Sequence, residues 1–496
     1  MPEDTVPAGG GAGTEFGRAA HRSAEDPGIE TPPRWRMIAA SVLVGGVAAG
    51  FVAAADTVAV WIVGIFAAVL VVGLIPILVG SRRPPLTLGP ADPPAGPLPT
   101  ILVLIAGRNE ATVLPSLIAD LAAQDHRNPD GSARFSIVIV DDRSTDGTGA
   151  AVMAAARAQG IADLVTVLRR DEAGAVDGKG AALASARPEA SELDVVAVLD
   201  ADARVGPAYL STAARYVAAG LPALTARRRT LQAERSALSL IQADEQTQDG
   251  EIQRGRWASG GCSEFRGNGI IIRTYVLSAI GGIPTASLTE DLDLSTRLAA
   301  ARGITVGWAL ELEAWEAPVP AWRGLWRQRL RWSEGAIRRF LAFTPSVLRS
   351  ARLPFRARWD FAAYGAQLAA PPLILGAIGG ALAFRNPGFP GALIGSYLLA
   401  GGVLAFDALR WETQPSGAPL SVPERLARSV RVALFSFIWL IAVNGALWRL
   451  ATRRGPARFD KTARTAAPGP APAEIAEIAE MASIAEHAPV REPNPR

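Results

Sequence analysis

Uninterrupted apolar segments stand near both ends of the chain and frame a long region of mixed composition. Residues 37–55 and 58–80 follow each other with only Asp56 and Thr57 between them, and each is long enough to cross about 30 Å of hydrocarbon as a helix. Three more apolar segments lie towards the other end, at residues 361–384, 391–406 and 430–448. The pattern predicts a multi-pass membrane protein whose first two spans form a helical hairpin.

Between these segments, residues 100–318 alternate short β-branched runs with amphipathic helical stretches, as an α/β domain does. Strands are predicted at Thr100–Ala106, Ser136–Val140, Leu164–Leu168 and Val195–Leu199. A helical pattern over residues 110–124 joins the first two strands into a βαβ unit. Ligands of such sheets bind outside the carboxyl ends of the strands, so the polar residues that follow each strand are the candidates for a site.

Arginines indicate the side of the membrane on which this domain lies. Arg34 and Arg36 precede the first apolar segment and Arg82 and Arg83 follow the second, so the positive-inside rule places both flanks and the domain in the cytoplasm. Three full spans after the domain would put the basic residues that follow the last segment outside, against the same rule. We therefore expect the short segment before Asp407 to be interfacial or re-entrant, with the C-terminus inside.

A basic collar precedes the C-terminal apolar segments. Residues 319–361 contain ten arginines against Glu334 and Asp360, a local balance of +8, interleaved with four tryptophans. Arginine and tryptophan at this density favour a surface at the level of lipid headgroups. The predicted organisation is a disordered N-terminus at 1–33, a transmembrane hairpin at 34–83, a Pro-rich linker at 84–99, an α/β domain at 100–318, basic Trp-rich interfacial helices at 319–360, a transmembrane region at 361–450 and a largely disordered tail at 451–496.

Composition excludes several classes of protein. Half of the chain (49%) is hydrophobic and 20% is charged, which agrees with a membrane protein, and the net charge of +3 is too small to indicate a nucleic-acid partner. The single Cys262 cannot form an intrachain disulfide. Three scattered histidines, His21, His126 and His487, cannot supply a histidine–cysteine zinc site or a Ser-His-Asp triad.

Carboxylates follow the second and fourth predicted strands. Asp141 and Asp142 offer acceptors for ribose hydroxyls and for a base N–H. Asp200 and Asp202 can aim at one divalent cation that bridges diphosphate oxygens, although a solvated turn is the alternative for this pair. The first strand ends in Gly107-Arg108-Asn109-Glu110, which lacks the glycines of a dinucleotide-binding turn, so the phosphates must be neutralised differently.

Lys179 stands out because the chain has only one other lysine, Lys461, and otherwise uses arginine. It lies between two glycines in Asp177-Gly178-Lys179-Gly180, which favours a point-charge contact with a phosphate. A surface charge in an Asp-Gly turn is the alternative.

Residues 289–291, Thr-Glu-Asp, begin a predicted amphipathic helix. Thr289 can cap that helix, and acidic residues in its first turn are favoured by the helix dipole. An acid at a helix N-terminus that faces a cleft also stays ionised at neutral pH, as a general base requires.

Together these motifs resemble those of the membrane-bound inverting glycosyltransferases of family 2, which include cellulose and hyaluronan synthases and bacterial glucosyldiacylglycerol synthases. The resemblance covers roughly residues 98–345. Its motifs, in the family's order, are Asp141-Asp142 with Ser144 and Asp146, Asp200-Ala201-Asp202, Thr289-Glu290-Asp291, and Gln328-Arg329-Leu330-Arg331-Trp332, which is similar to the family's Q-x-x-R-W. Arg266-Gly267-Asn268-Gly269 is similar to the acceptor-side segment of lipid-glucosylating members.

The resemblance implies a GT-A fold with a Rossmann-like mixed sheet, a UDP-sugar donor, and Mg²⁺ or Mn²⁺ as cofactor. The donor-binding residues it implies are Asn109, Glu110, Asp141, Asp142 at the uracil, Lys179 near the phosphates and Asp200 at the ribose or diphosphate. Asp202, with Asp200, would hold the metal, and Asp291, beside Glu290, would be the catalytic base. Gln328, Arg331 and Trp332 would lie on an interfacial helix that closes the pocket, with Arg331 at the diphosphate and Trp332 near the acceptor; an ordinary amphipathic helix is the alternative.

The reaction implied is a single displacement with inversion, and two acceptors compete for it. The modest number of spans and the basic, Trp-rich collar favour a membrane lipid, such as diacylglycerol, as the acceptor. The sugar transferred to it would be a hexose, with glucose as the first candidate. The Q-x-x-R-W motif is typical of processive polysaccharide synthases. A nucleotide sensor or scaffold that has lost catalysis is disfavoured, because every carboxylate that the reaction needs is present. The chain indicates no partner protein.

Overall fold

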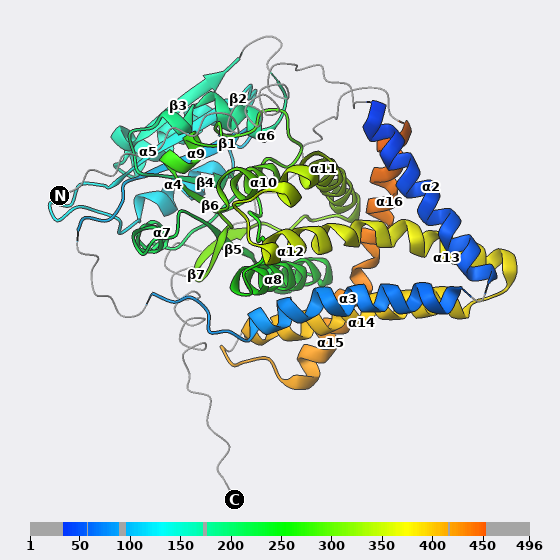
Figure 1. Ribbon diagram of the computed structural model, residues 1–496. Helices are drawn as coiled ribbons and strands as arrows, with labels where there is room; N and C mark the ends of the chain where they lie inside the picture. The colour runs from blue at the N-terminus through cyan, green and yellow to red at the C-terminus, as the bar shows by residue number, and fades with distance from the viewer. Residues whose placement is uncertain (1–32, 57, 89–95, 172–175, 415–416, 453–496) are drawn as a thin grey trace, which may run out of the picture.

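The structure is a computed structural model that describes residues 33–56, 58–88, 96–171, 176–414 and 417–452. It places an α/β domain beside a group of long apolar helices (Figure 1). The predictions for residues 1–32, for residues 89–95 of the Pro-rich linker and for residues 453–496 lie outside the described residues.

The domain is built on a mixed seven-stranded sheet of order β3-β2-β1-β4-β6-β5-β7 in the described part of the chain. The strands are β1 Ile101–Gly107, β2 Phe135–Asp142, β3 Val165–Arg170, β4 Val195–Asp200, β5 Ala223–Thr230, β6 Ile270–Arg273 and β7 Gly307–Glu316. The four predicted strands are β1 to β4, which pair in parallel, whereas β6 runs antiparallel to β4 and β5. The predicted mixed α/β sheet is therefore confirmed.

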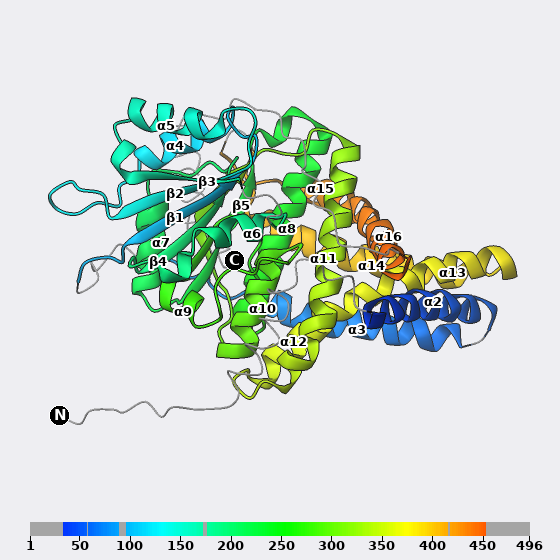
Figure 2. The same cartoon turned by 90° about the horizontal axis from the view of Figure 1, so that it is seen from above.

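The central strands are apolar runs because helices cover both of their faces. The helices of the domain are α4 Leu114–Ala122, α5 Thr148–Ala158, α6 Lys179–Ser185, α7 Tyr209–Ala218, α8 Ala237–Ala258, α9 Thr274–Ser278 and α10 Glu290–Arg302. α4, α5 and α7 bury their apolar side chains on one face of the sheet, and α6, α9 and α10 on the other (Figure 2). The register pairs Gly107 with Asp141 and Ala106 with Asp200, so the ends of β1, β2 and β4 meet at one edge.

The remaining helices form the membrane part and its connection to the domain. They are α2 Pro33–Ala55, α3 Ala59–Ser81, α11 Trp322–Arg349, α12 Phe355–Ala366, α13 Ala370–Phe384, α14 Gly388–Ala408, α15 Val422–Phe435 and α16 Phe437–Thr452. Within the described residues, five helical segments are long and apolar enough to cross a membrane: Trp35–Ala55, Ala59–Ser81, Phe355–Phe384, Gly388–Trp411 and Val422–Thr452. The boundary expected at residue 361 falls inside α12, so the basic collar runs directly into an apolar helix.

The first two apolar helices form where predicted but do not pack as a hairpin. α2 packs along α13, whereas α3 packs on α8 and α14 (Figure 1). Glycines allow the first pairing, because a Cβ on Gly50 would collide with the backbone of Gly376 and Ala377. The predicted hairpin is thus wrong in its packing: small-residue faces from distant segments decide which helices approach each other.

The middle C-terminal segment is longer than its apolar run. α14 has 21 residues and ends near Asp407, whose carboxylate accepts hydrogen bonds from Ser81 (2.7 Å) and Arg82 (3.0 Å) at the end of α3. The corresponding ends of α3 and α14 therefore lie together, beside the domain. The sequence set this segment apart because its apolar run is short, but the helix that forms is not short.

The last apolar segment is bent at Ser436, between α15 and α16. Arg431 of α15 pairs with Asp244 of α8 at 2.6 Å, which holds α15 against the domain. At the far end of α16, the carbonyl of Ala451 accepts a hydrogen bond of 3.2 Å from Arg36 Nε, close to the start of α2. The two ends of this segment thus contact α8 of the domain and the start of α2.

Candidate active site

Lys179 lies among oxygen atoms at the carboxyl edge of the sheet. Its Nζ is 2.5 Å from Asp200 Oδ1 and 3.3 Å from Glu290 Oε1, and it donates a hydrogen bond of 2.9 Å to the carbonyl of Gly267. Burial lowers the pKa of the ammonium, but the charges of Asp200 and Glu290 outweigh burial, so the pKa is raised and Lys179 stays protonated. The fold thus gathers the start of α6, the end of β4 and the start of α10 around one cation.

Asp291, the second residue of α10, lies next to this cluster. Burial raises the pKa of its carboxyl to about 6, and the charge of Glu290 adds to the rise, while the Leu292 N–H and the cation of Lys179 oppose it. A carboxylate with this pKa is a better proton acceptor than an ordinary aspartate and is still mostly ionised at pH 7. Gly267 lies directly beside this carboxylate, since a Cβ there would be 3.6 Å from Asp291 Oδ2, in ordinary van der Waals contact.

α11 holds the start of α10 in place. The capping role predicted for Thr289 is not found, because its hydroxyl makes no hydrogen bond to the backbone of the helix. Its side chain packs instead on Gly335 of α11, where any Cβ would collide with it. The hydroxyls of Thr289 and Ser333 are both buried, and neither has a hydrogen-bond partner among the described residues.

Asp200 and Asp202 are the candidates for a metal site. The Asp200 N–H donates to Asn268 Oδ1 at 3.1 Å, which fixes the end of β4, and Asp202 is buried two residues further on. No group of three acidic, histidine or cysteine side chains in the described ranges is arranged to hold a metal ion. Two carboxylates nevertheless fit Mg²⁺ or Mn²⁺, because such ions in nucleotide sites take their other ligands from phosphates and water.

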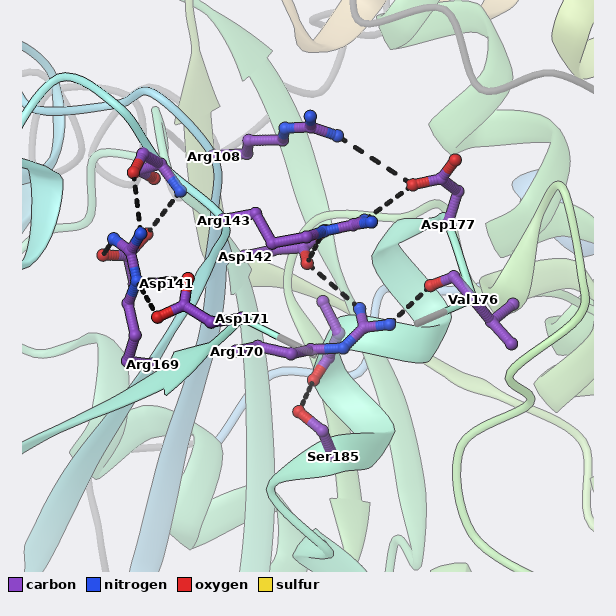
Figure 3. Close-up of polar contacts among 12 residues, drawn as sticks. Arg108, Asp141, Asp142, Arg143, Arg169, Arg170, Asp171, Val176, Asp177 and Ser185 are labelled. Atoms are coloured by element: carbon purple, nitrogen blue, oxygen red, sulfur yellow. Dashed lines mark hydrogen bonds and ion pairs between the residues drawn. The ribbon is translucent and has the colours of Figure 1, made fainter. Parts of the chain in front are cut away.

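Asp142, at the end of β2, is paired with two arginines (Figure 3). Its Oδ1 accepts hydrogen bonds from Arg143 Nε (3.0 Å) and Arg170 Nη1 (3.2 Å). Arg143 has a φ of 59°, in the left-handed region, and its Nη2 also donates to Asp177 Oδ1 at 2.6 Å. Asp142, which is predicted to accept a hydrogen bond from a base N–H, therefore also binds two guanidinium groups.

Asp141 and the loop after β1 make the adjoining frame. Asp141 is buried, with Arg169 Nη1 2.8 Å from its Oδ2 (Figure 3). Asn109 Oδ1 accepts the N–H of Thr145 (2.8 Å), and the N–H of Glu110 donates to Thr148 Oγ1 (2.9 Å). These bonds tie the loop after β1 to the loop after β2, so direct donor contacts of Asn109 and Glu110 stay predictions.

The predicted Q-x-x-R-W residues lie on α11. Trp332 stacks on Trp439 of α16 with ring centroids 6.3 Å apart, and the guanidinium of Arg329 lies 4.4 Å from the Trp332 ring. Gln328 Oε1 accepts a hydrogen bond of 2.7 Å from Arg329. Some residues of this motif are therefore held in packing contacts. Such contacts are expected if α11 is an ordinary amphipathic helix.

A single cavity of about 910 Å³ connects the cluster around Lys179 with the membrane helices. The predicted site residues that line it are Lys179, Asp200, Glu290, Asp291, Gln328, Arg331 and Trp332. Its other end is lined by apolar side chains of α3, α13, α14 and α16. Asp142 and Asp202 are not among the described residues that line this cavity, so the predicted residues divide into a cavity group and a neighbouring group at the sheet edge.

Three further residues that line the cavity are linked by hydrogen bonds, and only one of them lies in a segment that the sequence singles out. Arg266, in a segment that the sequence does single out, donates to Asp249 Oδ1 of α8 (2.6 Å) and to the hydroxyl of Tyr364 in α12 (2.8 Å). α8 and α12 reach the site only through the fold, and nothing in their sequences marks Asp249 or Tyr364.

Comparison with known proteins agrees with this arrangement. Residues 99–335 match the family described as "Glycosyltransferase like family 2". The chain is 28% identical over 382 residues to the β-monoglucosyldiacylglycerol synthase of Nostoc sp., covering 75% of this chain and 77% of that protein. It is 29% identical over 400 residues to the enzyme of that name from Synechocystis sp., covering 78% and 79%. A mannosyltransferase from Pyrobaculum calidifontis, solved with GDP-Man and Mn²⁺, shares the fold with a TM-score of 0.50 and 20% identity, over 77% of this chain and 98% of that one.

Proposed function

Because residues 99–335 form a glycosyltransferase family 2 domain, we propose that this protein is a membrane-bound inverting glycosyltransferase that moves glucose from UDP-glucose to the hydroxyl of diacylglycerol. The observation that carries the proposal is the cavity, which has the charged cluster around Lys179 at one end and apolar membrane helices at the other. A lipid acceptor needs both environments within one molecule's length. The relatives, named as glucosyldiacylglycerol synthases, support the same acceptor.

The chain supplies the groups for a single displacement. Asp291 takes the proton of the acceptor hydroxyl as its oxygen bonds to the anomeric carbon, while the bond from that carbon to the diphosphate breaks and UDP leaves. Lys179 and Arg331 neutralise the charge that grows on the leaving diphosphate. One displacement inverts the configuration, and no residue forms a covalent bond to the sugar.

Asp200 and Asp202 are the residues that would hold Mg²⁺ or Mn²⁺. Such an ion neutralises diphosphate charge when bound. The ammonium of Lys179 lies 2.5 Å from Asp200 Oδ1. We expect Lys179 to turn from Asp200 to the phosphates when the donor binds.

The neighbouring group at the sheet edge would bind the nucleoside. Asp142 accepts the N3–H of uracil through a lone pair that Arg143 and Arg170 leave free. The two arginines orient the carboxylate beside the base. This assignment extends the prediction made for Asp142 from its motif.

The arrangement in the membrane follows from where helix ends lie. We place α2, α3, the α12–α13 segment and α14 across the bilayer, with the bent α15–α16 pair returning to the side from which it starts. The contacts of Asp244 with Arg431 and of Arg36 with Ala451 support this placement. It keeps the start of α2, the end of α16 and the catalytic domain on the cytoplasmic side, and it gives the re-entrant role to the last apolar segment instead of the middle one.

The test is transfer from radiolabelled UDP-glucose by membranes containing the protein, with and without added diacylglycerol. Label that enters organic solvent, in a product whose anomeric carbon is β by NMR, supports the proposal. The Q-x-x-R-W motif favours a second candidate, a polysaccharide synthase, which would instead leave the label in an insoluble polymer.

A further inference from the structure

α3 is the apolar helix with the least cover from the rest of the protein. Only 6% of the residues in its most apolar stretch are buried, against 22% to 44% in the corresponding stretches of the other four candidate spans. Its cytoplasmic end is fixed, because a Cβ on Gly80 would collide with the carbonyl of Gly255 in α8. Further along, Phe66, Val69 and Gly73 line the cavity. A helix held tightly at one end and bare beyond it leaves room for something else to cover it.

The opposite walls of the cavity belong to a different set of helices. α13 packs on α2, α14 and α16, whereas α3 packs on α8 and α14 (Figure 1). Leu373 of α13 and Gly401 of α14 face the same space as Val69 and Gly73 of α3. The apolar part of the cavity therefore lies between α3 and α13, which both pack on α14.

Unmatched polar atoms mark the transition from the charged end to the apolar part. Thr289 and Ser333 are among the residues that line the cavity. Both are more than nine-tenths buried, and their hydroxyl oxygens have no hydrogen-bond partner within the described ranges. A buried hydroxyl without a partner is costly, so a ligand that accepts hydrogen bonds here would be stabilised. The ester oxygens next to a glycerol hydroxyl are acceptors of this kind.

A glucan chain fits this sequence of environments poorly. Its hydroxyls would lose their hydrogen bonds to water along the apolar walls of α3 and α13, and apolar walls supply no replacement. A lipid presents its hydroxyl, its ester oxygens and its hydrocarbon in the order in which the cavity presents carboxylates, free hydroxyls and apolar side chains.

We propose that the acceptor lipid lies in this cavity between α3 and α13, with its hydrocarbon against Val69, Gly73 and Gly401 and its ester oxygens at Thr289 and Ser333. This inference rests on the proposed function and adds the position of the acceptor to it. The hydrocarbon reaches the site sideways from the bilayer, because both walls are themselves membrane helices. The free hydroxyl of the lipid then meets Asp291.

Glycines on α3 and α14, two of the helices that line the cavity, provide matched substitutions. Gly73 of α3 and Gly401 of α14 line the cavity, and a Cβ at either position meets nothing within 4 Å, so Gly73→Trp and Gly401→Trp would project a bulky ring into the proposed lipid position. Gly64 of α3 and Gly395 of α14 also have open space but are exposed and are not among the cavity-lining residues, so Gly64→Trp and Gly395→Trp are the controls.

The measurement is label transferred to lipid from UDP-glucose in vesicles containing dioleoylglycerol, together with UDP binding by calorimetry. We expect Gly73→Trp and Gly401→Trp each to lower lipid glucosylation about tenfold or more through a steric block, with UDP affinity unchanged. The two control variants should keep wild-type transfer. A cavity variant that loses UDP binding is misfolded. In that case the other cavity variant decides whether the lipid position is right.

Two failures can be told apart. If wild-type protein forms labelled lipid and both folded cavity variants form as much, the proposed lipid position is wrong while the function stands. If wild-type protein forms no labelled lipid under any condition, the proposed function itself fails. Equal losses in cavity and control variants would also contradict the inference, because they would show an effect of tryptophan on the helices in general.

Discussion

Two groups of carboxylates stand at the carboxyl edge of the same sheet, and different cations hold them. Asp142 is bound by the guanidinium groups of Arg143 and Arg170, whereas Asp200 and Glu290 share the ammonium of Lys179. A guanidinium is planar and donates in fixed directions, while an ammonium on a flexible stem can change partners. We therefore expect the first group to be a fixed frame for the nucleoside and the second to be a site whose cation changes partners during the reaction.

The largest effect is expected at the base of the second group. Asp291→Asn keeps the size of the side chain but removes the proton acceptor, so transfer should fall by about 10³-fold or more. UDP binding, measured by calorimetry, should stay nearly intact. Full turnover by purified Asp291→Asn protein would show that another group takes the proton.

If Lys179 leaves Asp200 for the phosphates of the donor, two substitutions should have opposite effects on Mn²⁺ binding. Asp202→Ala should weaken Mn²⁺-dependent UDP binding by about tenfold or more, because it removes a ligand of the ion. Lys179→Met frees Asp200 from its ammonium partner, so it should strengthen Mn²⁺ binding without donor, as read by electron paramagnetic resonance, and weaken UDP binding. Unchanged donor-free Mn²⁺ binding in Lys179→Met protein would refute the exchange.

The fixed frame should respond differently. Arg170→Gln removes one of the two cations on Asp142 but leaves Arg143 in place, so the carboxylate keeps a partner. We expect the KM for UDP-glucose to rise by about threefold to tenfold, with kcat nearly unchanged, since uniform binding is lost. A fall in kcat with unchanged KM would place Arg170 at the reacting centre instead.

The smallest effect is a shift in pH dependence. With the pKa of Asp291 raised to about 6, kcat/KM should fall as the pH drops through that value, because the base becomes protonated. Glu290→Gln removes a charge that raises this pKa, so the acidic limb should move to lower pH. Lys179→Met removes a charge that lowers it, so the limb should move to higher pH. Profiles that shift in the same direction would contradict the arrangement.

Sequence pattern predicted the parts of the fold that depend on local periodicity. The runs that became β1 to β4 are apolar because both faces are buried, and the carboxyl ends of parallel strands meet wherever such a sheet forms. Asp141, Asp142 and Asp200 could therefore be placed together in advance. The apolar helices were equally visible, because hydrocarbon thickness sets their length.

The sequence did not predict α8, whose buried charges include Asp244, Glu251 and Arg254. Its buried positions carry charges, so apolar periodicity does not reveal it, and Asp244 is buried because it pairs with Arg428 and Arg431, far along the chain. Thr289 shows the same limit: the local pattern favoured a cap, and contact with Gly335 of α11 decided otherwise.

The chain by itself thus determined that β1 to β4 and the apolar helices form, and which carboxylates gather at one edge of the sheet, because periodicity, strand direction and hydrocarbon thickness act on neighbouring residues. Only the tertiary structure decided that Lys179 lies between Asp200 and Glu290, that α2 pairs with α13, and that a cavity joins the carboxylates to α3. Those features depend on close approach between segments that are distant in sequence, where small residues and paired charges determine which surfaces fit.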